Sequence, residues 1–275
     1  MTIALIGAGG KMGFRIARNF LGSEEKIHFV EVSPAGIARL EEIGVEVTSI
    51  EVALSASDAA ILAVPDTALS TVAEQVSRAM KPGSLVLALD PAVPLAGGLI
   101  FREDLSYGIA HPCHPSLFHW EPIEADLRDF YGGISASQGA VAALLQGPES
   151  VYAQIESIAR RIFAPVDKVY RLTLEQMATL EPALVETLAQ TCMEVIREGL
   201  DEVIARGVPA DAARAFLLGH LRIQAAVLFK EVDGSFSDAA YKISRHARPR
   251  IFQEDWKSIF TPESIAEQVA LIVKK

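Results

Sequence analysis

The chain has 275 residues, of which 50% are hydrophobic and 22% are charged, and its formal net charge is −10 at pH 7. This composition is typical of a compact globular protein and excludes a largely disordered one. An acidic chain without a block of Lys or Arg is poorly suited to nucleic acid or to anionic membranes. The two cysteines give no disulfide framework. With no targeting segment and no membrane-length apolar run, we expect a cytoplasmic protein whose partners are small molecules and copies of itself.

The first 172 residues alternate short apolar runs with helical patterns. The apolar runs are the predicted strands Ile3–Ile6, Ile27–Val32, Val45–Val47, Ala59–Val64, Leu85–Leu89, Tyr107–Ala110 and Val166–Tyr170. The predicted helices are Lys11–Phe20, Pro34–Glu42, Thr67–Met80 and Glu149–Phe163. Most runs are apolar throughout, as in parallel strands buried on both faces. We therefore predict an α/β fold over residues 1–172, a Rossmann doubly wound parallel sheet that binds ligands at the carboxyl ends of its strands.

From residue 173 onward the pattern is helical. Residues 174–206 show no strand signal and predict one long helix, with a kink at Pro182. A second helix over residues 210–230 and shorter helices follow. We predict an all-helical domain over residues 173–275 for substrate binding and dimerisation. The long helix has more apolar residues than one small domain can bury, so we expect a homodimer through these helices.

The strongest motif is a glycine-rich turn between the first strand and the first helix. Such glycines let the backbone approach a pyrophosphate, whose charge is stabilised by the helix N-terminus. The spacing departs from G-x-G-x-x-G by one extra residue, and such turns also occur without a ligand. The sequence predicts a dinucleotide site formed by Gly7, Gly9, Gly10, Lys11, Met12 and Gly13.

Two acids lie near the ends of later strands. Glu31 stands where the ribose-binding acid of a dinucleotide site belongs. Its carboxylate would accept a bond from the 2′-hydroxyl and repel a 2′-phosphate, which predicts NAD rather than NADP; the alternative is a solvated acid. Asp66 follows the strand Ala59–Val64 and either contacts the cofactor or caps the next helix.

The strand Tyr107–Ala110 runs into His111-Pro112-Cys113-His114-Pro115. Imidazole is suited to general-base chemistry near neutral pH and to metal ligation. We predict that His114, which lies further along the loop, is the functional histidine. In the alternative interpretation both histidines bond to backbone carbonyls. Cys113 is interpreted as a packing residue.

The helical part contributes three more candidates. Glu181 lies in an apolar stretch, where an unpaired carboxylate is costly to bury. Glu186 is either functional or the start of a polar stripe with Gln190 and Glu194 at helical spacing. His220 lies in an apolar helix and is either functional or structural.

The glycine turn, the acid of the second strand and the helical C-terminal part together resemble the 6-phosphogluconate dehydrogenase-like superfamily. This superfamily includes the β-hydroxyacid dehydrogenases, and the ketol-acid reductoisomerases are structurally related to it. The β-hydroxyacid dehydrogenases have a catalytic lysine in the first long C-terminal helix, whereas Glu181–Glu186 contains none. A more specific resemblance covers the whole chain. It is to the D-apionate oxidoisomerases, through His-Pro-Cys-His-Pro, Leu180-Glu181-Pro182, Gly219-His220-Leu221 and Glu254-Asp255-Trp256.

The resemblance implies an enzyme that uses NAD to oxidise the branched sugar acid D-apionate at C2. A hydroxymethyl group then moves from C3 to C2, which gives 3-oxo-isoapionate by an α-ketol rearrangement. A divalent metal ion suits this shift, so His114 and Glu181 are expected as metal ligands. Glu186 or His220 would be an acid/base or a substrate contact, with His220 from the partner subunit. The alternatives are an NAD-dependent β-hydroxyacid dehydrogenase without rearrangement and a non-catalytic NAD(H)-sensing protein.

Overall fold

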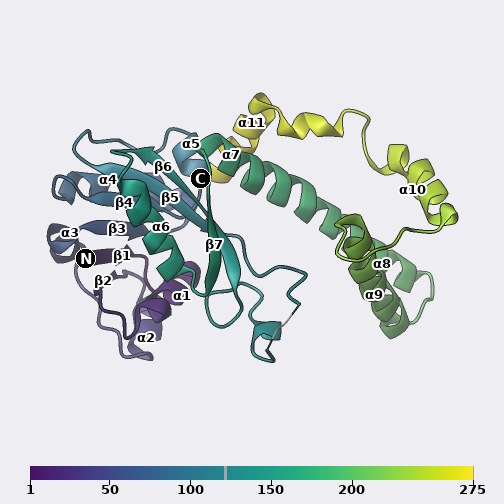
Figure 1. The fold of residues 1–275 in the computed structure, drawn as a ribbon, viewed down its shortest axis with the longest axis horizontal. Helices are drawn as coiled ribbons and strands as arrows, with labels where there is room; N and C mark the ends of the chain where they lie inside the picture. Colours follow the sequence, from purple (N-terminus) through teal and green to yellow (C-terminus); the bar gives the residue numbers. More distant parts are fainter. Residues whose placement is uncertain (121–122, 275) are drawn as a thin grey trace. The chain divides into compact units, whose positions relative to one another are not determined.

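The computed structural model of the chain describes residues 1–120 and 123–274. The chain forms two compact units, Met1–Leu180 with Ala266–Lys275, and Glu181–Ile265. The sequence predicted a boundary between residues 172 and 173, so these units differ from the predicted domains at both ends of the helical part. The functions assigned to the two predicted domains stay a prediction. Figure 1 shows the sheet of the first unit and the helices of the second.

The first unit is built on one seven-stranded sheet in the order β2-β1-β3-β4-β5-β6-β7. Its strands are β1 (Thr2–Ile6), β2 (Lys26–Val30), β3 (Ala59–Leu62), β4 (Leu85–Ala88), β5 (Ser106–Pro112), β6 (Gln138–Gln146) and β7 (Val166–Arg171). Strands β1 to β5 run parallel, whereas β6 is antiparallel to β5 and parallel to β7. The chain moves from β1 to β2 on one side and returns to β3 on the other, which confirms the predicted Rossmann-type sheet.

Two strand predictions need correction. The segment Val45–Val47 is not a strand, since it makes one isolated bridge from Val47 to Phe29. It has only three residues, and Glu46 and Val47 are exposed, so little apolar burial holds it to the sheet. The sequence also failed to predict β6. That strand contains a glycine and several alanines, which have low strand propensity.

Helices cover both faces of this sheet (Figure 1). They are α1 (Lys11–Phe20), α2 (Pro34–Glu41), α3 (Ile50–Ala56), α4 (Asp66–Ala79), the short α5 (Ala92–Leu95), α6 (Val151–Ile162) and α7 (Leu174–Ala178). The 3-10 turn η1 (Asp126–Arg128) lies in the loop between β5 and β6. Successive residues of β1 enter different cores, Leu5 with α1 and α6 and Ile6 with α3 and α4, because strand side chains alternate between faces. The central strands β1, β3 and β4 are buried on both faces and therefore present only their ends to a ligand.

The second unit is helical. The remaining elements are the π-helical segment η2 (Thr179–Gln190), α8 (Thr191–Ala205), α9 (Ala210–Leu228), α10 (Asp238–Ile251), the 3-10 turn η3 (Trp256–Phe260) and α11 (Pro262–Val273), which ends in the first unit. Residues 174–205 are helical without a break, as predicted, but a wide π-helical segment surrounds Pro182. Proline has no N–H for the normal α-helical bond, which favours such local rearrangement. Among the described residues, no helix is long and apolar enough to cross a membrane.

Candidate functional site

The glycine turn after β1 has a shape that side chains would prevent. Gly7 has φ +81°, and a Cβ there would lie 2.4 Å from the carbonyl oxygen of Ala63. A Cβ on Gly13 would lie 2.0 Å from the carbonyl oxygen of Gly7. The N–H groups of Gly7 and Ala8 donate to the carbonyl of Val30 at 2.9 and 3.0 Å. The turn is therefore packed tightly among β1, β2 and β3, and its glycines are required by this packing.

The turn leads into the N-terminus of α1, which is open to an anion. The N-cap residue Gly10 has no side chain to bond the first N–H groups, and the first turn of this fully described helix has no acidic residue. Helix N-termini carry unsatisfied N–H groups and a partial positive charge. Lys11, the first residue of α1, adds a full positive charge. All six residues predicted for the dinucleotide site lie here, and the donors suit a pyrophosphate.

Glu31 holds the glycine turn in place. Its carboxylate accepts N–H bonds from Gly9, Val32 and Ser33, each at 2.8 Å. On the other side of the turn, Arg39 donates from Nη1 to the carbonyl oxygen of Gly9 at 3.0 Å. A carboxylate has about four acceptor positions, so one remains for a ribose hydroxyl. The sequence predicted the ribose contact, which stays a prediction, but it did not predict this bracing role.

A second group of polar side chains gathers at the carboxyl ends of β3, β4 and β5. Asp66 is the first residue of α4, and Asp90 accepts the N–H of Ala92 at 2.7 Å. Burial raises the pKa of Asp66 and the negative charge of Asp90 raises it further, while the backbone hydrogen bond of Asp66 and, to a smaller extent, His111 partly offset these effects. Asp66, Asp90 and His111 therefore interact electrostatically at the carboxyl ends of the parallel strands β3, β4 and β5. Either predicted role of Asp66, cofactor contact or helix cap, is compatible with this place.

Both histidines of the β5 loop bond to backbone carbonyls through Nδ1. His111 bonds to the carbonyl oxygen of Leu89 at 2.7 Å, and His114 bonds to that of Tyr131 at 2.8 Å. A carbonyl oxygen only accepts, so Nδ1 carries the proton in each ring, and Nε2 of the neutral ring has the lone pair. The two rings meet edge to face with centroids 6.4 Å apart. In His114 one nitrogen is satisfied, as in the structural alternative, while Nε2 retains the electron pair of a base or metal ligand.

His114 also has an unusual backbone. Its φ is +62°, in the left-handed region that non-glycine residues seldom adopt. It precedes Pro115, and residues before proline normally prefer extended backbone. Such strain persists where the surrounding structure fixes it, and it is concentrated at functional sites. Next to it, Cys113 is exposed, and a Cβ on Gly139 would lie 3.3 Å from its Sγ. The interpretation of Cys113 as a packing residue stays a prediction.

Tyr131 joins the glycine turn to His114 within the first unit. Its carbonyl accepts the hydrogen bond from Nδ1 of His114. The centroid of its ring lies 5.0 Å from Nζ of Lys11 and 4.3 Å from Cζ of Arg15. Sequence reasoning missed Tyr131 and Arg15. Only the repeat of basic residues on the first helix, four positions apart, could have drawn attention to them.

The candidates on the helical part lie in the second unit. Glu181 is half-buried and Glu186 is exposed, and both lie on η2. Their spacing of five residues matches the i→i+5 bonding of a π-helix, which brings them toward one face. An α-helix would separate them. π-Helical segments occur frequently at functional sites, and the sequence predicted only a kink here.

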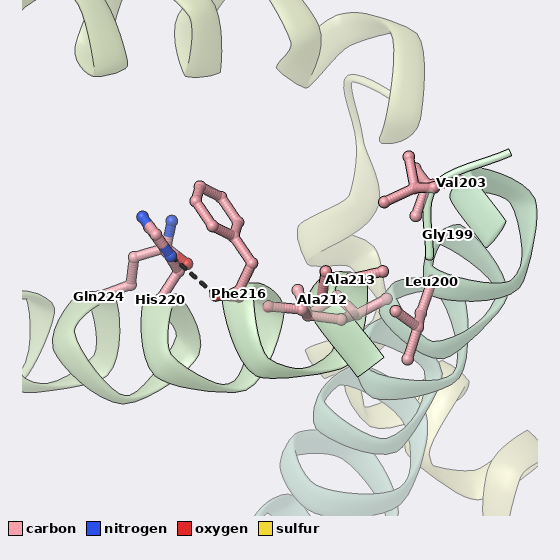
Figure 2. A pocket seen from close by; sticks show the side chains of 11 residues that line it. Gly199, Leu200, Val203, Ala212, Ala213, Phe216, His220 and Gln224 are labelled. Carbon is pink, nitrogen blue, oxygen red and sulfur yellow. Dashed lines mark hydrogen bonds between the residues drawn. The ribbon is translucent and has the colours of Figure 1, made fainter. Parts of the chain in front are cut away.

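His220 lines an apolar groove of about 660 Å³ between α8 and α9, shown in Figure 2. Its Nδ1 donates to the carbonyl of Phe216 at 2.7 Å, and the two rings stack with centroids 4.0 Å apart. Leu200 and Ala213 form part of the apolar wall. His220 is thus anchored by its own helix, while its Nε2 retains a lone pair for another contact.

The predicted metal ligands, His114 and Glu181, belong to different compact units. Their pairing therefore stays a prediction. Within residues 1–120 and 123–274, no group of three or more His, Cys, Asp or Glu side chains could hold a metal ion.

Comparison with known proteins places this arrangement in a family. Residues 119–273 match the family described as phosphogluconate dehydrogenase (decarboxylating) C-term, and residues 2–90 match NADP oxidoreductase coenzyme F420-dependent. D-apionate oxidoisomerase from Cupriavidus necator is 48% identical over 98% of both chains. The enzyme of that name from Rhizobium rhizogenes is 49% identical over 98% of this chain and 99% of its own.

A solved structure is equally similar. It is described as a semialdehyde dehydrogenase NAD-binding protein from Cupriavidus necator in complex with calcium and NAD. It is 48% identical, covers 98% of this chain and 99% of its own, and superposes with a TM-score of 0.96. The chain therefore belongs to the D-apionate oxidoisomerase family, within the 6-phosphogluconate dehydrogenase-like superfamily.

Proposed function

We propose that this chain is an NAD-dependent oxidoreductase that converts D-apionate to 3-oxo-isoapionate. The observation that carries the proposal is His114, whose Nδ1–H is fixed by Tyr131 and whose Nε2 retains a lone pair. Contacts through Tyr131 connect this histidine to the glycine turn. The names of the relatives support the substrate, and the NAD complex of the solved relative supports the cofactor.

The residues that would hold NAD are those of the turn and the first strand ends. The N–H groups at the start of α1 and the charge of Lys11 would bind the pyrophosphate. The remaining acceptor position of Glu31 would bind a ribose hydroxyl, and its negative charge would repel a 2′-phosphate. When bound, NAD supplies the acceptor for the hydride that leaves C2 of the substrate.

His114 is the proposed general base. As C2 becomes a carbonyl, its hydroxyl proton passes to Nε2, which forms the imidazolium. The rearrangement then needs the C3 hydroxyl to lose its proton and the C2 carbonyl oxygen to gain one. The bond from C3 to the hydroxymethyl carbon breaks, and its electron pair forms the bond to C2. Glu181, Glu186 and His220 are the proposed groups for these later proton transfers and for substrate contact.

A divalent metal ion, with His114 and Glu181 as ligands, is the alternative proposal for His114; the metal would then take the lone pair on Nε2, and Glu186 or His220 would be the base. The lone pair on Nε2 of His114, with Nδ1–H bonded to a carbonyl, suits a metal-ligating histidine. The calcium in the solved relative adds support. A metal would polarise the carbonyl next to the migrating group. If the proposal holds, chelator-treated protein will lose rearrangement activity and regain it with added Mg²⁺, Mn²⁺ or Ca²⁺; undiminished activity after complete chelation would contradict it.

A homodimer through the helical unit is the proposed assembly. Many large apolar side chains of this unit are exposed, such as Phe216 at 70% and Leu228 at 65%. The apolar groove between α8 and α9 adds to this exposed surface, and large exposed apolar patches are characteristic of protein interfaces. In the dimer, His220 of one subunit would contribute to the site of the other.

The decisive experiment combines cofactor and product. Purified protein with NAD and D-apionate should generate NADH absorbance and, by NMR, a 3-oxo acid with a rearranged carbon skeleton. His114→Ala should lower kcat by about 10²–10⁴-fold, the usual contribution of a general base. The control is His119→Ala, since His119 lies in the same loop and pairs with Asp126 at 3.5 Å. NADH with an unrearranged product would instead identify a simple β-hydroxyacid dehydrogenase, and NAD binding without NADH would remove the substrate assignment.

A further inference from the structure

The loop over residues 129–136 has a shape fixed from within. Asp129 is only 5% exposed, and its Oδ2 accepts N–H bonds from Ile134, Ser135 and Ala136 at 3.1, 2.9 and 3.1 Å. The carbonyl of Asp129 also accepts the N–H of Gly132, which has φ +70°. Charge-assisted bonds to a buried carboxylate hold a backbone firmly. The loop is therefore a rigid support for Tyr131, which lies inside it.

One face of α1 lies against this loop. Lys11, Arg15 and Asn19 occur four residues apart and so share a side of the helix. The first two place their cationic groups 5.0 and 4.3 Å from the centre of the Tyr131 ring. Asn19 donates to the carbonyl of Ile162 at 3.0 Å, which ties the helix to the end of α6. Cations at such distances are attracted to an aromatic face, so Tyr131 is held by the helix that begins at the glycine turn.

The other end of Tyr131 meets His114. The Tyr131 carbonyl accepts the Nδ1–H of His114 at 2.8 Å, and the two rings are 6.1 Å apart, edge to face. The partner of Nδ1 decides which nitrogen of a neutral imidazole carries the proton. The backbone of His114 has φ +62°, a conformation that a non-glycine residue adopts only when its surroundings impose it. The orientation of its ring therefore depends on Tyr131.

We infer that Tyr131 is a positioning residue that fixes the tautomer and direction of His114, and that Arg15 holds Tyr131 in place. The Asp129 bonds fix the internal shape of the loop, whereas the contacts of the Tyr131 ring with Arg15 and Lys11 fix where the loop lies against α1. The ring thereby sets the position of the Tyr131 carbonyl relative to His114. The inference rests on the proposed function only for the role of His114 as a base. The tautomer of His114 in the protein without substrate does not depend on that role.

The first test is the tautomer itself, by ¹⁵N NMR of protein labelled at histidine. The chain has six histidines, and the His114→Ala spectrum assigns the signals of His114. Wild type and Tyr131→Phe should show one tautomer with the proton on Nδ1. Tyr131→Ala and Arg15→Leu should show a mixture of tautomers. Arg18→Leu removes an exposed arginine from the same helix and should leave the wild-type signals.

The second test is kinetic. Arg15→Leu and Tyr131→Ala should lower kcat by about 10–100-fold, since small displacements of a catalytic group have effects of this size. The KM for NAD should change less than about threefold, and Tyr131→Phe should retain wild-type kcat because it keeps the ring. If Tyr131→Ala does not fold, Arg15→Leu decides both tests.

Unchanged tautomers in both disruptive variants would overturn the inference, as would a loss in Tyr131→Phe as large as in Tyr131→Ala. If His114→Ala retained full activity, the proposed function of His114 would fail, while the tautomer result would still decide the role of Tyr131.

Discussion

The two units of the chain differ in how their apolar residues are used. The first unit buries both faces of its sheet in two large clusters that alternate along the strands. In the second unit, the buried hydrophobic residues among those described are Ala183, Leu200, Ala213, Ala226 and Ile265. Most of its other apolar side chains face solvent. A unit of this size needs a much larger buried core to be stable.

The glycine turn of the first unit has a shape that is set internally, whereas the second unit leaves apolar surface exposed. In the first unit the glycine turn is held by Glu31, Arg39 and neighbouring strands, so its geometry does not depend on a partner. In the second unit α8 and α9 pack together but leave an apolar groove. We therefore expect substitutions in the first unit to act on cofactor binding, and substitutions in the second to act on assembly.

The largest expected effect is that of Gly13→Ala in the first unit. The new Cβ would lie 2.0 Å from the carbonyl oxygen of Gly7, so the turn itself must shift. The N–H groups at the start of α1 would then no longer have the positions and directions that bind a pyrophosphate. We expect the Kd for NAD, measured by calorimetry, to rise by about 100-fold or more, equivalent to about 2.7 kcal/mol.

The matched control is Gly234→Ala, where an added Cβ would meet open space. It should leave the Kd for NAD unchanged. If Gly13→Ala folded and bound NAD normally, the internally fixed turn could not be the dinucleotide site.

A smaller effect is expected from Phe216→Asp in the second unit. Phe216 is 70% exposed and borders the groove. A charge at this aromatic position should weaken the proposed dimer by about 10-fold or more, because interface aromatics often contribute over 1 kcal/mol. Sedimentation across a dilution series measures the change.

Val52→Asp is its counterpart in the first unit, since Val52 is 55% exposed on α3. It should leave the sedimentation of the protein unchanged. An equal effect of both substitutions, or a monomeric wild-type chain, would contradict the contrast between the units.

The sequence predicted the parts whose signals are local. Strands β1, β3, β4 and β5 were predicted because their apolar runs are strong, and the turn of Gly7 was predicted because its glycines are adjacent in the sequence. β6 was missed because its small residues carry little strand signal. The π-helical segment was predicted only as a kink, since Pro182 shows where regular bonding fails but not how the chain rearranges.

The site was predicted less completely, because its contacts join distant positions. Tyr131 meets Lys11 and Arg15 of the first helix through tertiary packing, and no local pattern connects them. The positive φ of His114 is likewise imposed by its surroundings, against the usual preference before proline. Glu31 was predicted as the acid at the end of the second strand that contacts the ribose, but its hydrogen bonds to the glycine turn became evident only from the structure.

The smallest expected effect concerns Asp66, whose ionised carboxylate lowers the stability of the first unit at neutral pH. Its folded pKa is raised above the ordinary 3.8, mainly by burial and then by Asp90. A carboxyl group with a raised pKa is most favourable to folding below the ordinary value, and this advantage is lost as pH rises through the folded pKa. At pH 7 Asp66→Asn should therefore raise the Tm slightly, and the difference should shrink as the pH falls toward 3.8.

Asp58→Asn is the opposing control, because Lys81 and the N–H of Thr2 lower the pKa of Asp58. Its carboxylate stabilises the fold above the ordinary pKa, so the substitution should lower the Tm at pH 7. The stabilisation is lost as pH falls through the lowered folded pKa.

If Asp66→Asn raises the Tm but weakens NAD binding or turnover, Asp66 contributes to function despite its cost to stability. If the Tm rises and both functions are unchanged, Asp66 serves neither. A lower Tm at pH 7 would show that its place at the start of α4 outweighs its burial beside Asp90.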